Sequence, residues 1–228
     1  MIDQARNLIR ESLSGAQPAC LTCSFQAECM VVLHLVLEQH PEIPVLFLDT
    51  GYHFPETYAY RDRMGAAWNL NLVNLQPRQT VAEQETQFGI LYQSVPDRCC
   101  GLRKVEPLFA ALEGYGVWFT GLRREQSPTR ASLQPDDAFR LPSGKQLRKI
   151  SPLALWRNRE VWATSNSIRS RCYRCMSGAI PVLAVSPAPV FRRARKISVP
   201  AVGAGTSWNA VFILEPPRSK RWRPYSDS

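Results

Sequence analysis

The sequence predicts an α/β fold: a mostly parallel sheet with helices on both faces. Two observations carry this prediction. Continuous apolar runs of strand length recur along the chain, and segments whose apolar residues repeat with helical spacing separate them. Strands therefore alternate with helices, which is the order that argues for a mostly parallel sheet.

The elements follow one another as far as residue 163. Residues 1–13 form an amphipathic helix with early acidic residues, a pattern unlike a secretory signal. We expect strands within residues 18–25, 43–49, 70–76 and 116–121, and helices within 26–40, 54–64 and 105–114 and from about 158. Beyond Ala163, prolines, short apolar runs and arginine clusters replace this pattern. We therefore expect a core domain of residues 1–163 and an irregular tail of residues 164–228.

The net charge of +9 belongs to the tail. Residues 1–163 hold 17 Lys and Arg against 17 Asp and Glu, whereas residues 164–228 hold 11 against 2. The basic residues cluster as FRRARK and PRSKRWR among Pro, Ser and Ala, so the charge predicts no specific nucleic-acid partner. An arginine tail that holds nucleic acid is the alternative, and its binding would depend steeply on salt. No run of about 18 apolar residues predicts a membrane span, and we expect a cytoplasmic protein.

Polar residues follow several of the expected strands. In a parallel sheet, ligands bind beyond the carboxyl ends of the strands, where helix N-termini present free N–H groups. The residues expected at this edge are Ser24, Phe25 and Glu28 after the first strand, Asp49, Thr50 and Gly51 after the second, and Arg123 and Arg124 after a later one. They could hold a phosphate, a ribose and anionic oxygens, respectively. The S-x-x-x-E pattern before an apolar run is more often a helix cap than a binding loop, and this alternative stays open.

The seven cysteines are expected to be reduced thiols or metal ligands in a cytoplasmic chain. The adjacent pair Cys99 and Cys100 precedes a basic helix start, which favours a metal cluster over two core cysteines. Cys20 and Cys23 are expected to be core thiols, because the C-x-x-C spacing on a strand places them on opposite faces. Cys29, on the helix that follows, is expected to be a core thiol as well.

These motifs together resemble the thioredoxin-dependent adenylyl-sulfate reductases, relatives of phosphoadenylyl-sulfate reductase. The resemblance covers about 140 residues and rests on residues 24–28, LDTG at 48–51, FPET at 54–57, CCGLRKVEPL at 99–108, TGLRREQSPTRA at 120–131 and KISPLALW at 149–156. It implies the adenine-nucleotide α-hydrolase-like fold. The Cys-Cys element is typical of the iron–sulfur, adenylyl-sulfate branch.

The resemblance also implies roles for individual residues. Ser24 and its turn would hold the phosphosulfate, and Asp49, Thr50 and Gly51 would lie against the nucleotide. Lys104 would sit between cluster and substrate, Arg123 and Arg124 would add positive charge, and Cys99 and Cys100 would supply half the ligands of a [4Fe-4S] cluster. The reaction implied reduces adenylyl sulfate to sulfite and AMP, with thioredoxin as the reductant, in sulfate assimilation and cysteine biosynthesis. Homo-oligomer formation stays open.

The C-terminal part departs from this pattern. The E-C-G-[IL]-H motif that carries the family's nucleophilic cysteine is absent from the chain, and Cys172 and Cys175 stand about ten residues too early for the second ligand pair. Read from the third base of permitted codons, residues 178–191 become GYTSIGCEPCTSL and residues 197–214 become IRSGRWGGNKLECGIHI, which match the missing segments. We predict that one nucleotide is missing near the codons of Ala163 and Thr164, so that the tail is out of frame.

Three alternatives stay open at this point. The chain could prefer phosphoadenylyl sulfate, or it could be a nucleotide-binding pseudoenzyme of the same fold, because the nucleophile is absent. It could also be an ATP pyrophosphatase or adenylyltransferase, but Cys99 and Cys100 and the absence of an S-G-G-x-D-S loop argue against that.

Overall fold

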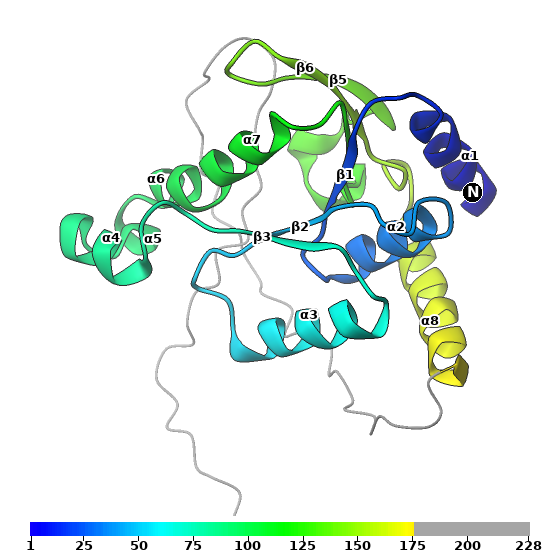
Figure 1. Cartoon of the computed structure of the whole chain (residues 1–228), viewed down its shortest axis with the longest axis horizontal. Helices are drawn as coiled ribbons and strands as arrows, with labels where there is room; N and C mark the ends of the chain where they lie inside the picture. Colours follow the sequence, from blue (N-terminus) through cyan, green and yellow to red (C-terminus); the bar gives the residue numbers. More distant parts are fainter. Residues whose placement is uncertain (176–228) are drawn as a thin grey trace, which may run out of the picture. The chain divides into compact units, whose positions relative to one another are not determined.

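The computed structural model describes the backbone of residues 1–175 and the side chains to residue 168. Its centre is a six-stranded sheet of order β3-β2-β1-β4-β6-β5 (Figure 1). Every neighbouring pair is parallel except β5 and β6, which are antiparallel. The strands are β1 (Ala19–Thr22), β2 (Val45–Leu48), β3 (Leu72–Leu75), β4 (Val117–Phe119), β5 (Asp136–Arg140) and β6 (Gln146–Ile150). This confirms the predicted α/β class.

Helices cover both faces of the sheet. They are α1 (Ile2–Leu13), α2 (Ala27–Leu37), α3 (Pro55–Ala67), α4 (Val81–Phe88), α5 (Leu91–Ser94), α6 (Pro96–Cys100), α7 (Glu106–Leu112) and α8 (Asn158–Cys175). Helices α1, α2, α3 and α8 share one core with β1 and β2. The connection from β3 to β4 runs back across the sheet, so a right-handed crossover places α7 on the opposite face. There, Phe109 of α7 packs on Phe139 of β5.

The sheet has a topological switch point between β1 and β4. From β1 the chain moves to β2 on one side, and it later returns to β4 on the other. The loops that leave β1 and β4 flank this switch point, which is where ligands bind in open α/β sheets. Both loops carry residues that the sequence singled out.

Helix α8 runs across the predicted boundary between the core domain and the tail. The expected boundary between residues 163 and 164 falls inside this helix, which continues to Cys175. Ser165 and Ile168 are both 6% exposed, and Ile168 lies seven residues after the fully buried Val161, so it extends the same apolar stripe. Helical structure thus reaches beyond residue 163. The remainder of the tail prediction lies outside the described residues.

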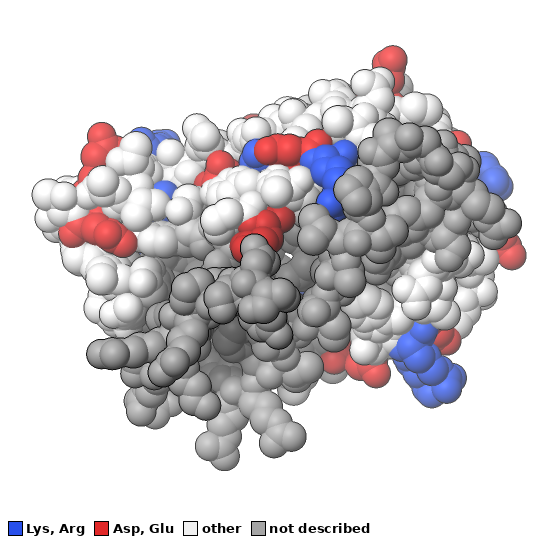
Figure 2. All heavy atoms as spheres, turned by 90° about the horizontal axis from the view of Figure 1, so that it is seen from below, with Lys and Arg blue, Asp and Glu red and all other residues white. Residues whose placement is uncertain are grey.

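Charges on the described surface are mixed in sign. On the face shown in Figure 2, basic and acidic side chains of the described residues are interspersed, in agreement with the zero net charge of residues 1–163. Among the residues that the structure describes, none of the helices has the length and apolar character needed to span a membrane.

Candidate functional site

The turn between β1 and α2 is held in a strained conformation. Phe25 has a φ of 59°, in the left-handed region that is costly for a residue with a side chain. Its buried ring packs against Phe47 and Tyr60, with centroid distances of 5.9 and 6.3 Å, and this packing holds the turn. Ser24 is exposed, and its Oγ lies 3.4 Å from Sγ of Cys29. The first turn of α2, which follows, presents N–H groups without intrahelical acceptors.

The turn after β2 is closed by its own aspartate. Oδ1 of Asp49 accepts from the Gly51 N–H at 3.1 Å and from the Tyr58 hydroxyl at 2.6 Å. Gly51 has a φ of 74°, and a Cβ there would lie 2.7 Å from Cγ2 of Val81. A glycine is therefore required at this position. Thr50 is buried, and its Oγ1 accepts from the Tyr52 N–H at 3.3 Å, so its side chain also holds the turn.

Arg123, in the loop after β4, is a buried cation with protein partners. The residue is 4% exposed, and Nη2 donates to Glu28 Oε1 at 2.7 Å while Nη1 donates to Glu125 Oε2 at 3.0 Å. Glu28 was expected to contact substrate and Arg123 to offer it positive charge. In the structure they bond to each other across the switch point, which fastens the start of α2 to the β4 loop. A buried guanidinium needs such partners because desolvation is costly.

Arg124 lies beside this pair and is less buried. Its Nε donates to the Leu133 carbonyl at 2.7 Å, and its Nη2 donates to Gln134 Oε1 at 3.2 Å. The side chain also lines a hollow of about 440 Å³, together with Leu155 and Trp156. Of the two predicted arginines, Arg124 is the one placed to meet an anion at the surface.

The adjacent cysteines close α6 and lead into a π-helical turn, Gly101–Val105. Such turns occur frequently at functional sites. Cys99 is 7% exposed, and burial, followed by the neighbouring Cys100, raises the pKa of its thiol. Cys100 and Lys104 are partly exposed. Among the described residues, no set of three or more Cys, His, Asp or Glu is arranged to hold a metal ion.

Arg103 joins the cysteine segment to the turn after β2. It is 3% exposed, and its Nε donates to the Thr50 carbonyl at 2.5 Å. Its Nη1 donates to Oε1 of Gln84 on α4 at 3.0 Å, and the guanidinium lies 5.2 Å from the ring centroid of Tyr52. The sequence analysis did not single out Arg103 or Gln84. The sequence signal that could have identified Arg103 is an arginine one helical turn after Cys99, in a short and partly apolar helical segment.

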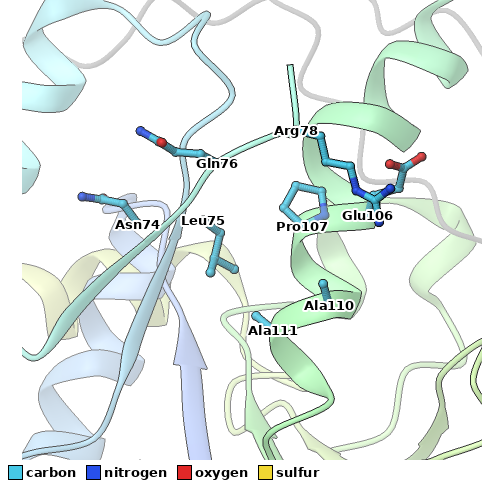
Figure 3. Close-up of a pocket in the computed structure, with 8 residues that line it drawn as sticks. All are labelled: Asn74, Leu75, Gln76, Arg78, Glu106, Pro107, Ala110 and Ala111. Carbon is cyan, nitrogen blue, oxygen red and sulfur yellow. The ribbon is translucent and has the colours of Figure 1, made fainter. Parts of the chain in front are cut away.

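A separate cavity of about 320 Å³ lies between the end of β3 and α7. Figure 3 shows Leu75, Ala110 and Ala111 lining one part of it and Arg78 beside Glu106 at another. None of the residues predicted for the site lines this cavity. It is therefore distinct from the edge formed by the three loops.

The sequence profile of the phosphoadenosine phosphosulfate reductase domain matches residues 18–168, from β1 into α8. The chain belongs to this family. The match covers all three loops of the candidate site and the cysteine segment, and it confirms the family that the sequence predicted.

Curated members of the family are similar over the same region. The chain is 48% identical over 143 residues to an adenosine 5'-phosphosulfate reductase of Streptomyces coelicolor, covering 62% of this chain and 58% of that protein. It is 43% identical over 145 residues to the Geobacillus kaustophilus protein of that name, covering 61% and 59%. It is 40% identical over 145 residues to a phosphoadenosine 5'-phosphosulfate reductase of Gloeobacter violaceus, covering 63% and 59%. The chain thus matches less than two thirds of each relative's length.

Solved structures agree on the fold. The phosphoadenylyl-sulfate reductase of Candida auris, in a phosphate complex, superposes with a TM-score of 0.62 at 24% identity, covering 72% of this chain and 79% of that one. A U34-tRNA thiolase of Methanococcus maripaludis with its [4Fe-4S] cluster gives a TM-score of 0.51 at 14% identity, covering 74% and 64%. These similarities place the chain among adenine-nucleotide α-hydrolase-like folds.

Proposed function

We propose that this chain carries the nucleotide-binding part of a reductase that converts adenylyl sulfate to sulfite and AMP with thioredoxin as the reductant. The observation that carries this proposal is the position of the Cys99-Cys100 segment, because Arg103 connects it to the LDTG turn by a hydrogen bond. The relatives named adenosine 5'-phosphosulfate reductase, at 48% and 43% identity, support the substrate. The reaction belongs to sulfate assimilation, and we place the protein in the cytoplasm.

The substrate would lie along the carboxyl ends of β1, β2 and β4. The Ser24 hydroxyl and the N–H groups that open α2 would hold the phosphosulfate, and the Asp49–Gly51 turn would lie against the nucleoside. Arg124 and Lys104 would neutralise anionic oxygens from either side. Phe25, Glu28 and Arg123 would act as positioning residues, because their side chains pack or pair within the protein.

The described cysteines fit half of a [4Fe-4S] site. Cys99 and Cys100 offer two thiols, and the buried amide of Gln84, which interacts with the Cys99 thiol, could donate a hydrogen bond to a cluster sulfur. Arg103 and Lys104 add positive charge next to an anionic group. The cluster would supply local charge that tunes the substrate's environment. Cys172 and Cys175 lie in the last part of α8, beyond residue 168, where the structure describes the backbone but not the side chains.

Because the nucleophilic cysteine is missing, we expect nucleotide binding and sulfite formation to be separable in this chain. The family motif that carries the attacking cysteine is absent from the sequence, so the chain as written is expected to bind nucleotide without forming sulfite. We propose that residues from about 164 are read out of frame, and that restoring one nucleotide near that codon recovers both the second cysteine pair and the nucleophile.

The deciding experiment compares the chain as written with a frame-restored version. AMP and adenylyl-sulfate binding are measured by calorimetry, and sulfite release by a coupled assay with thioredoxin. We expect both proteins to bind and only the restored one to release sulfite. A folded chain without affinity for either nucleotide would refute the site, and sulfite release by the chain as written would refute the proposed missing step.

Phosphoadenylyl sulfate is the alternative substrate, because one relative at 40% identity carries that name. The same binding experiment with a 3'-phosphorylated nucleotide distinguishes the two. We expect the 3'-phosphate to weaken binding, since the adjacent cysteine pair is typical of the adenylyl-sulfate branch. Gel filtration of the same samples establishes whether the chain forms a homo-oligomer.

A further inference from the structure

Two thiols meet beneath the β1–α2 turn. Cys23 follows β1 directly and is 3% exposed, whereas Cys29 lies in the first turn of α2 and is partly exposed. The Cys23 thiol is hydrogen-bonded to the Cys29 sulfur, which also lies 3.4 Å from Oγ of Ser24. The left-handed backbone at Phe25 folds the turn back, and its N–H donates to Sγ of Cys23 at 3.4 Å.

The Cys29 sulfur also touches the second loop of the switch point. A Cβ placed on Gly121, in the loop after β4, would lie 3.1 Å from this sulfur. Cys29 therefore lies between the two loops that would hold the substrate. A change of covalent state at this sulfur acts on both of them.

The surroundings of the two thiols shift their pKa values in opposite directions. The hydrogen bond from Cys23, followed by that from Ser24, lowers the pKa of Cys29 to about 7 despite its burial. Burial raises the pKa of Cys23 well above its ordinary value. Near neutral pH, a substantial fraction of Cys29 is therefore thiolate next to a neutral Cys23 thiol, and the free N–H groups at the start of α2 favour the same charge.

We propose that Cys29 and Cys23 form a peroxide-sensitive dithiol, in which Cys29 is oxidised and Cys23 resolves it to an intramolecular disulfide. The Cys29 thiolate attacks one oxygen of hydrogen peroxide, which gives the sulfenic acid and, after proton uptake, water. The Cys23 sulfur then displaces the hydroxyl group as a second water, and the S–S bond forms. Peroxide is reduced by two electrons, and the two thiols are oxidised by two.

The disulfide removes the present contacts of Ser24. The sulfurs, now in hydrogen-bond contact, approach to about 2.05 Å, and the short turn that contains Ser24 and Phe25 follows. The loss of phosphosulfate binding that we expect from this change rests on the proposed function. Formation of the disulfide itself does not depend on that function.

Glutamate-specific digestion reads the linkage directly, because Glu28 separates the two cysteines. The reduced full-length chain is titrated with hydrogen peroxide at pH 7, free thiols are blocked with N-ethylmaleimide, and the digest is analysed by mass spectrometry. We expect peptide 12–28, which holds Cys20 and Cys23, to be linked to peptide 29–38 and to separate on reduction. Peptide 29–38 that stays unlinked, or that is oxidised no faster than the peptides of Cys99 and Cys100, overturns the proposal.

Three matched serine variants identify the partners. Cys23→Ser is expected to abolish the link and to leave Cys29 as a sulfenic acid that dimedone traps. Cys29→Ser is expected to leave peptide 12–28 reduced. Cys20→Ser is the control, since Cys20 is fully buried and burial raises its pKa to about 12, so the link should persist. Loss of the link in the Cys20 variant, with an unchanged circular dichroism spectrum, assigns the bond to Cys20 and refutes the proposal.

AMP binding separates this inference from the proposed function. We expect the oxidised chain to bind AMP at least about tenfold more weakly than the reduced chain, with recovery on treatment with dithiothreitol. Equal affinity of both forms, with the disulfide present, would refute the link between redox state and site. Absence of AMP binding in the reduced chain would refute the proposed function and leave the disulfide unaffected.

Discussion

Arg103→Ala tests whether one buried arginine holds the cysteine segment against the β2 turn. The wild-type guanidinium is 3% exposed and donates to the Thr50 carbonyl and the Gln84 amide oxygen. Alanine leaves both acceptors without this donor, and both hydrogen bonds are buried in the folded chain. The substitution also removes the contact with the Tyr52 ring.

The expected cost follows from those two acceptors. A buried acceptor without a partner costs about 1–3 kcal/mol, so two of them give about 2–6 kcal/mol in total. That is a large share of the ~5–15 kcal/mol that stabilises an ordinary domain. Arg103→Lys keeps the charge but cannot donate to both acceptors in the geometry of a guanidinium, and we expect an intermediate loss.

Urea unfolding followed by far-ultraviolet circular dichroism measures this cost. Arg98→Ala is the matched control, because Arg98 is exposed and stacks on Phe88 at 4.0 Å from the ring centroid, which is worth about 0.5–1 kcal/mol. An Arg103→Ala free energy of unfolding within about 0.5 kcal/mol of that of the control, near the usual spread for surface substitutions, would refute the reasoning.

Three further substitutions test the turn, the ion pair and the cap. Gly51→Ala should lower the free energy of unfolding in urea more than Gly144→Ala does. Both glycines have a positive φ, but only at Gly51 does another atom lie within 3 Å of the new Cβ, so equal losses would show that this contact has no effect on stability. Glu28→Ala should cost about 1–3 kcal/mol, because it removes the closest carboxylate of the buried Arg123 and leaves Glu125 as its charged partner; a loss below about 0.5 kcal/mol would mean that solvent replaces Glu28. Hydrogen bonds from Thr80, the N-cap of α4, lower the pKa of Glu83. The carboxylate therefore stabilises the folded chain fully above pH 4.5, and this stabilisation is lost as the pH falls through the lowered pKa of the folded state. In Glu83→Gln, thermal unfolding should therefore lose less stability below pH 4.5 than in the wild type, and parallel pH curves would contradict this.

The fold prediction was correct for the strands that are determined by burial alone. The runs that became β1, β2 and β4 are apolar on both faces, because helices cover both sides of the sheet. The short helices α4, α5 and α6 were not predicted. Their segments lack a sustained apolar period, and α4 depends on a local capping box between Thr80 and Glu83. The antiparallel β5 was missed for a related reason, since only Phe139 of its residues is buried.

The candidate site was predictable in position but not in orientation. The rule for parallel sheets places the loops after β1, β2 and β4 at one edge, and the structure has them there. Which side chains face a ligand depends on tertiary partners that sequence spacing does not reveal. Glu28 and Arg123 are 95 residues apart and each matched a binding motif, yet they form a 2.7 Å ion pair with each other.

The buried arginines explain how family motifs can persist in a chain without its nucleophile. Arg103, within CCGLRK, and Arg123, within TGLRR, each bond a loop of the site to another element, so each stabilises the fold as well as the site. Substitution of either leaves buried partners unpaired whether or not the protein turns over. The two arginines therefore support the family and the nucleotide site through the fold, independently of sulfite formation.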